Sequence, residues 1–144
     1  MSHVRITKVF RYNETFDADQ TQDPALSAAK DQIFRDFKAY LLTDGHHNWL
    51  PQTPFGRDEL YDHPNTAASV KQACLRHVHI VPVAVIERVR RKYDATSDVH
   101  LVYCIDDVKG YACALALIEP GHDMAKDPGF LTHLAQIAEE FYSR

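Results

Sequence analysis

The stretch VHLVYCIDDVKGYACALALI, residues 99–118, decides the fold class. Residues 99–105 and 111–118 consist mainly of β-branched, aromatic and other apolar side chains, which is typical of strands. Between them, residues 106–110 (DDVKG) have the aspartate and glycine content of a tight turn. The sequence therefore predicts a β-hairpin, and the other elements are placed relative to it.

Two more strands are predicted N-terminal to this hairpin. Residues 4–12 (VRITKVFRY) and residues 78–81 (VHIV) are again rich in β-branched and aromatic side chains. Between these strands, residues 46–64 hold three of the seven prolines, and we expect them to form a long irregular loop. A loop of this length inside a small domain usually has a function or is ordered by a partner.

Two Asp-Pro pairs predict where helices begin, because aspartate can cap the first turn and proline fits inside it. The first helix begins at Asp23, follows apolar residues at helical spacing and ends near Thr43. The second begins at Asp127 and continues towards the C-terminus. The apolar stripes of these two helices predict core residues at Phe34, Leu134 and Phe141.

The two remaining segments are shorter. Residues 66–76 predict a short helix, and residues 83–92 suit either a short helix or an edge strand. The order of elements indicates an α+β fold: a mostly antiparallel sheet of about four strands, with N-terminal helices and a C-terminal helix. With 144 residues the chain has the length of one domain, which we expect to span residues 1–144. Residues 1–24 are interpreted either as an N-terminal extension or as the first strand and its loop.

Composition narrows the class of protein. No apolar run approaches the roughly 20 residues that cross a bilayer, and the N-terminus lacks the apolar segment of a secretory signal. Three cysteines without a C-x-x-C pair argue against a disulfide framework, so we expect a cytoplasmic protein. The net charge of −4 weighs against general binding of free nucleic acid. However, residues 71–92 contain six basic residues and one acidic residue, whereas residues 93–144 contain three and nine.

Three of the nine histidines, His79, His100 and His122, come from one predicted sheet or its edge. One chemistry that uses such a set is RNA cleavage without a metal: a base takes the proton of a 2′-OH, and an acid protonates the leaving 5′-oxygen. Cations stabilise the phosphate during such a reaction. The chain offers Arg57, Lys126 and the basic cluster at residues 88–92.

A second chemistry is metal-assisted hydrolysis, in which His77, His79 or His100 would act together with an aspartate. No H-E-x-x-H or comparable closed motif supports this alternative. Taken singly, each histidine is more often structural or solvated than catalytic.

Several motifs occur together in one order along the second half of the chain. They include FGRD at residues 55–58, LYD at 60–62, HLVYC at 100–104 and MAKD at 124–127. In this order and spacing, residues 50–144 resemble the YafO-type toxins of type II toxin–antitoxin systems. These toxins resemble in turn the RelE-like ribosome-dependent mRNA endonucleases.

The resemblance implies a RelE-like toxin domain that cleaves translated mRNA in the ribosomal A site by 2′-OH attack. It implies a protein antitoxin as partner, no metal, no cofactor and no membrane association. His122 fills the acid–base position after the last strand, and His79, His100 or Asp58 would supply further active-site groups. Arg57 and Lys126 would bind phosphate, together with the predicted contacts at Arg88, Arg90, Arg91 and Lys92. Two alternatives stay open: a non-cleaving module that binds the ribosome or another partner, and the metal-dependent hydrolase.

Overall fold

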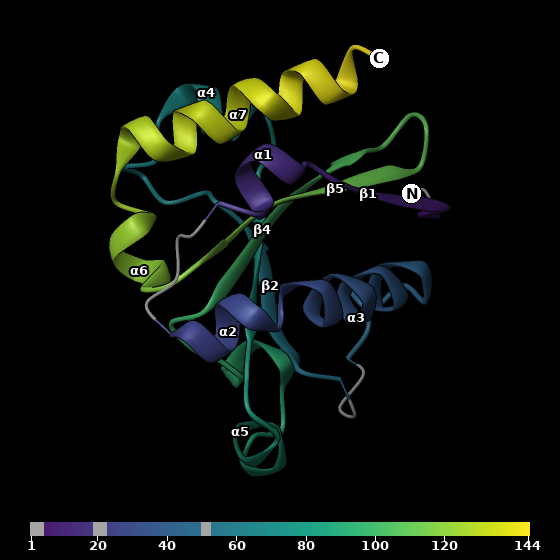
Figure 1. The fold of residues 1–144 in the computed structure, drawn as a ribbon, viewed down its shortest axis with the longest axis vertical. Coiled ribbons are helices and arrows are strands. Elements are labelled where there is room, and N and C mark those ends of the chain that lie inside the picture. The colour runs from purple at the N-terminus through teal and green to yellow at the C-terminus, as the bar shows by residue number, and fades with distance from the viewer. Residues whose placement is uncertain (1–4, 19–22, 50–52) are drawn as a thin grey trace.

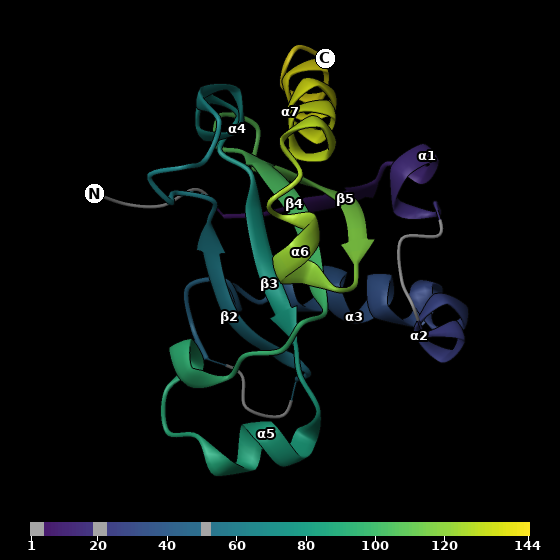
Figure 2. The same cartoon turned by 90° about the vertical axis from the view of Figure 1, so that its left-hand side faces the viewer.

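The computed structural model describes residues 5–18, 23–49 and 53–144. Within these residues, one five-stranded sheet has the strand order β1-β5-β4-β3-β2 (Figures 1 and 2). The strands are β1 (Lys8–Arg11), β2 (Phe55–Leu60), β3 (Arg76–Ile80), β4 (His100–Asp106) and β5 (Tyr111–Ile118). Neighbouring strands are antiparallel except for β1, which runs parallel to β5. The α+β prediction is confirmed, and the sheet is one strand larger than expected.

The predicted hairpin is β4 and β5, with a turn held by Asp106. Its carboxylate accepts hydrogen bonds from the backbone N–H groups of Val108 (3.0 Å) and Lys109 (3.1 Å). Gly110 has a positive φ of 73°, which glycine adopts without the steric penalty of a Cβ. Both strands are buried on both faces of the sheet, which explains their nearly continuous apolar sequence.

The extra strand, β2, lies within the predicted irregular loop, so that prediction is wrong for residues 55–60. The sequence FGRDEL lacks the apolar alternation of a half-buried strand. Its pairing with β3 instead supplies the backbone partners, and the register shifts between Phe55 and Asp58. Strand formation here depends on a tertiary contact that no local pattern reports.

The helices follow their predicted caps. Asp23 caps α2 (Pro24–Ala28), and Asp127 caps α7 (Pro128–Tyr142), each through side-chain acceptance of backbone N–H groups. The first predicted helix is divided, because Ala29 leaves helical geometry before α3 (Lys30–Leu42) begins. The remaining helical elements are α1 (Asn13–Phe16), α4 (Ala68–Gln72), α5 (Val83–Arg88), the 3-10 turn η1 (Lys92–Asp94) and α6 (Gly121–Met124).

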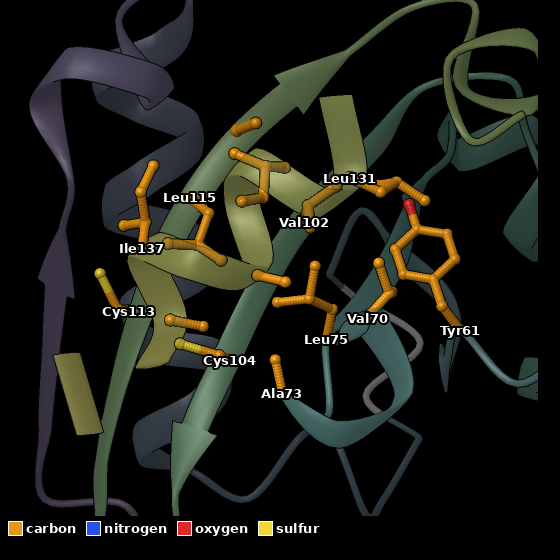
Figure 3. Packing of buried hydrophobic residues seen from close by; sticks show 14 of the residues in the cluster. Tyr61, Val70, Ala73, Leu75, Val102, Cys104, Cys113, Leu115, Leu131 and Ile137 are labelled. Carbon is orange, nitrogen blue, oxygen red and sulfur yellow. The ribbon is translucent and has the colours of Figure 1, made fainter. Parts of the chain in front are cut away.

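Two apolar clusters lie on opposite faces of the sheet. On one face α3 packs against a cluster that includes Phe37 and Tyr103, with Phe34 partly buried at its edge. On the other face α7 and α4 cover a cluster that includes Leu134 and Phe141 (Figures 1 and 3). Figure 3 shows side chains of β4 and β5, among them Val102, Cys104, Cys113 and Leu115, gathered with Ile137 of α7.

Helix α7 covers only part of its face of the sheet. Beyond it, α6 passes in front of the strands and α5 lies past the far end of β2 and β3 (Figure 2). This part of the face receives the side chains of β3 and β4 near His79 and His100. Among the described residues, no helix is both long and apolar enough to cross a lipid bilayer.

Candidate functional site

A pocket on this face, which we call the histidine pocket, is lined by His77, His79, His100 and His122. Strand alternation explains the first three. His77 and His79 are two residues apart on β3 and share one face, and His79 lies opposite His100 on β4. His122 reaches the same place from α6, directly after β5. Further lining residues include Arg57, Glu59, Tyr61, Asp62, His63, Asn65, Thr66 and Lys126.

The four imidazole rings contact one another. Ring centroids are 4.1 Å apart for His79 and His100, 5.2 Å for His77 and His100, and 5.3 Å for His100 and His122. Tyr61 stacks on His77 at 4.1 Å with an interplanar angle of 18°. The structure therefore brings together the three histidines considered for RNA cleavage with His77, which was considered only for metal binding, and it adds Tyr61.

Burial keeps the inner rings uncharged. Burial first, and then electrostatic repulsion from His100, lowers the pKa of His77 and of His79 to about 3. Burial also lowers the pKa of His100, against a hydrogen bond to Ser97 that raises it. At neutral pH these rings are neutral imidazoles, which can each donate one hydrogen bond and offer one lone pair.

Ser97, in the loop before β4, fixes which nitrogen is protonated in two of these rings. Its backbone N–H donates to His79 Nδ1 at 3.0 Å, so a neutral His79 has its proton on Nε2. Its carbonyl oxygen accepts from His100 Nε2 at 3.0 Å, so a neutral His100 has its lone pair on Nδ1. One residue thus sets the same tautomer, with the proton on Nε2, in two adjacent rings, but it occupies the lone pair of His79 and leaves that of His100 free.

His122 differs from the inner rings because its side chain is 67% exposed and paired with an aspartate. Its Nδ1 lies 2.8 Å from Asp98 Oδ1, and its backbone N–H donates to the same oxygen at 2.9 Å. The backbone hydrogen bond is the main cause of a lowered Asp98 pKa, so the carboxylate is ionised at neutral pH. A carboxylate at Nδ1 leaves Nε2 able to accept a proton, which is the arrangement of a general base.

Sequence analysis did not single out Asp98, although it belongs to this dyad. It lies in the DATSD segment, residues 94–98, whose composition is typical of a turn. The signal that could have identified it is its place directly before the predicted strand at residues 99–105, which contains His100. Loop residues at strand ends often have functional roles.

The two cations predicted to bind phosphate, Arg57 and Lys126, both line the pocket. The Arg57 guanidinium lies 3.8 Å from the centroid of the Tyr93 ring, and its Nε donates to the Tyr93 carbonyl oxygen at 2.7 Å. These two contacts fix the orientation of the guanidinium group, including its remaining N–H groups. Lys126 is exposed.

The basic cluster is placed differently, since none of its four members is among the described pocket-lining residues. Lys92 points inward, where its Nζ donates to Tyr40 Oη and to the Gly56 carbonyl oxygen, each at 2.6 Å. Burial lowers the pKa of this ammonium group to about 8. Elsewhere, Arg91 pairs with Asp94, Arg88 donates to the Ala84 carbonyl oxygen, and Arg90 is exposed.

The structure does not bring Asp58 to the histidines. Asp58 follows Arg57 on β2, so its side chain points to the opposite face of the sheet. There its fully buried carboxylate accepts hydrogen bonds from Tyr40 Oη and Tyr103 Oη at 2.7 Å and from Arg76 at 3.3 Å. These contacts give Asp58 a structural role, because its carboxylate links β2 to α3 and β4.

The pocket also offers metal-ligating atoms. Within the part of the chain that is described, three sets have one ligand atom from each member within 4.8 Å of the others. Two of them overlap at the pocket, namely His77, His79 and His100, and Asp98, His100 and His122, whereas the third, Asp44, His46 and His47, has no member among the described pocket-lining residues. Both sets at the pocket contain His100. Imidazole nitrogen and carboxylate oxygen are ligands for zinc and similar divalent ions.

Fold and site together define a small α+β protein with a histidine-lined pocket on the uncovered part of one sheet face. The family described as Toxin YafO, type II toxin-antitoxin system, matches residues 35–143, and the chain belongs to this family. The resemblance seen in the sequence is thereby confirmed, and the matched range includes every pocket residue named above. A type II system pairs its toxin with a protein antitoxin, so membership implies such a partner. No curated protein and no solved structure matches the chain.

Proposed function

We propose that this protein is a ribosome-dependent endoribonuclease that cleaves translated mRNA at the histidine pocket by 2′-OH attack. The observation that supports this most directly is the Asp98–His122 dyad, whose histidine lines the same pocket as two cations, Arg57 and Lys126. A base beside positively charged groups is the combination that phosphodiester transfer within RNA requires.

In the proposed reaction, His122 Nε2 takes the proton from a 2′-OH, and that oxygen attacks the adjacent phosphorus. The bond to the 5′-oxygen breaks, leaving a 2′,3′-cyclic phosphate and a 5′-OH. The imidazolium formed on His122 is stabilised by the Asp98 carboxylate and returns the proton to the 5′-oxygen through solvent. Arg57 and Lys126 stabilise negative charge on the phosphoryl oxygens.

The inner rings have a different part in this proposal. A neutral His79 has its proton on Nε2, because Ser97 donates to Nδ1. It can therefore donate a hydrogen bond to a phosphoryl oxygen without a change of charge. His100 supports both His79 and His122 by ring contact.

The charge of the chain favours dependence on the ribosome. A protein with a net charge of −4 has weak general attraction for free RNA. Holding mRNA in place on the ribosome would replace that missing affinity, since positioning alone can supply a large part of a rate enhancement. We therefore expect little cleavage of free RNA.

Primer extension on a defined mRNA, with and without translating ribosomes, tests this function. We expect cuts that require ribosomes, and we expect His122→Ala to reduce their rate on the order of 10²–10⁴-fold. His133→Ala is the matched control, because His133 is an exposed histidine on α7 outside the pocket-lining set. Full cleavage by His122→Ala would overturn the assignment. Blocked translation with intact mRNA would instead favour a non-cleaving binding module.

A further inference from the structure

Five side chains with metal-ligating atoms form the two overlapping sets described above, and the four histidines among them line the histidine pocket. The contacts that Ser97 makes with His79 and His100 distinguish these sets. Because Nδ1 of His79 accepts from Ser97, the other nitrogen of the neutral ring has a proton and no lone pair for a metal. The set that contains His77 and His79 is therefore poorly prepared for coordination.

The set of Asp98, His100 and His122 is better suited to metal coordination. His100 donates its Nε2 proton to the Ser97 carbonyl oxygen, which is the outer contact that metal-bound histidines usually make. Its Nδ1 then has the lone pair, and this buried atom has no hydrogen-bond partner among the described residues. The residue as a whole is 2% exposed.

The three residues are also joined by the backbone. Gly121 lies against the His100 ring so closely that a Cβ there would be 2.4 Å from Nδ1. The N–H of Gly121 donates to the Asp98 carbonyl oxygen at 2.7 Å, and the N–H of His122 donates to the Asp98 carboxylate. Nδ1 of His100 thus lies beside residues 121–122. The backbone of this segment is in turn hydrogen-bonded to Asp98.

We infer that Asp98, His100 and His122 form a binding site for a zinc-class divalent ion, and that the bound ion switches the pocket off. Two imidazoles and one carboxylate are a donor set that such ions accept, with the remaining position open to solvent. Around a tetrahedral ion, ligand atoms lie about 3.3 Å apart, given metal–ligand distances of about 2.0–2.1 Å. The ligand atoms of the three residues now lie within 4.8 Å of one another. Rotation of the exposed side chains of Asp98 and His122 can bring these atoms to the shorter distance.

The inhibitory consequence rests on the proposed function, whereas the binding of the ion does not. A metal at His122 Nδ1 displaces the Asp98 contact and leaves the ring proton on Nε2. That nitrogen can then no longer accept the proton of a 2′-OH. Binding of the ion and cleavage of RNA therefore exclude each other.

Isothermal titration of untagged, chelator-treated protein with zinc chloride tests the site. We expect one ion per chain for the wild type and for His77→Gln, which belongs only to the other set. Asp98→Asn should weaken zinc binding by more than the roughly 10–100-fold that loss of an outer contact causes. His133→Gln controls for surface histidines. Circular dichroism checks the fold of each variant. If His77→Gln does not fold, Asp98→Asn still tests the site, because the Asp98 side chain is half exposed and its substitution should leave the fold intact.

Two results would overturn the site: no stoichiometric zinc binding by the wild type, or binding that survives Asp98→Asn and is lost in His77→Gln. The inhibitory effect is tested in the ribosome assay. Stoichiometric zinc should abolish cleavage, and a zinc-selective chelator should restore it. Zinc binding with undiminished cleavage would overturn the inhibition, whereas zinc binding by a protein that never cleaves would contradict the proposed function and leave the site supported.

Discussion

Ser97 shows how strongly one residue can determine the chemistry of its neighbours. Its N–H occupies the lone pair of His79 Nδ1, and its carbonyl oxygen accepts the Nε2 proton of His100 and leaves Nδ1 of that ring free. The same residue types in another loop geometry would have other tautomers and other uses. At this scale, the exposed His122 and the buried rings are distinct groups even though all are histidines.

The Asp98 carboxylate should matter to catalysis through its charge. Asp98→Asn keeps an acceptor for the His122 backbone N–H but removes the charge that stabilises an imidazolium. We expect the single-turnover cleavage rate on ribosomes to fall by about 10²-fold, near the lower end for general base catalysis because the dyad is exposed. Asp107→Asn, in the hairpin turn, is the control. A wild-type rate for Asp98→Asn would contradict the dyad.

Arg57 should contribute to activity more than to stability. Its stacking on Tyr93 and its bond to the Tyr93 carbonyl oxygen lie at a partly exposed position. We expect Arg57→Ala to slow cleavage at least 10-fold while the free energy of unfolding changes by less than about 1 kcal/mol. Arg57→Lys should recover part of the rate. Equal losses of activity and thermal stability would point to a structural contact instead.

At the scale of elements, β2 illustrates a strand that is stabilised by polar contacts. Asp58 accepts hydrogen bonds from α3 and β4 through Tyr40 and Tyr103, and it pairs with Arg76 of β3. Lys92 of η1 adds a bond to the β2 backbone at Gly56. These bonds join β2 to four other elements, although the strand itself has few apolar residues.

Removal of the Asp58 charge should therefore destabilise the fold. Asp58→Asn leaves the partly buried Arg76 guanidinium without its counter-ion, and we expect the free energy of unfolding to fall by about 3–5 kcal/mol. Urea denaturation at pH 7.5 measures this, with the exposed Asp107→Asn expected within about 0.5 kcal/mol of wild type. An unchanged midpoint would show that the network contributes little.

Elements encoded by local signals could be predicted from the sequence, and those encoded by tertiary contacts could not. The β4–β5 hairpin and the caps at Asp23 and Asp127 each depend on adjacent residues. The placement of His77 and His79 on one face follows from strand alternation alone, whereas their meeting with His100 also needs the register of β3 and β4. By contrast, β2 forms because it pairs with β3. Asp98, in the loop before β4, contacts His122 of α6, which lies 24 residues later in the sequence.

For the whole molecule, the buried histidines link folding to pH. His77 and His79 have pKa values of about 3 in the folded chain, against about 6.5 when unfolded. Between these values the unfolded chain binds more protons, so stability is lost as the pH falls from about 6.5 towards 3 and is constant above it. At pH 5 the loss is about 2 kcal/mol for each ring.

Urea denaturation at pH 7.5, 6.0 and 5.0 measures this dependence. We expect the free energy of unfolding to decline at each step below pH 6.5, and His77→Gln to flatten the decline because one titrating ring is gone. His133→Gln should follow the wild-type slope, since that side chain is exposed. A flat profile from pH 7.5 to 5.0 would contradict the neutral, buried state of the two rings.

The pairing of β1 with β5 has a consequence in time rather than in space. Residues 8–11 are synthesised well before their partner strand, which begins at residue 111, so β1 waits for the intervening residues before it can join the sheet. Contacts between residues so distant in sequence slow folding. His122 follows β5 directly, so the edge of the sheet and the proposed base become available at the same late moment. A nascent chain would therefore lack the proposed base, and the activity proposed for it, until β5 and α6 have been synthesised.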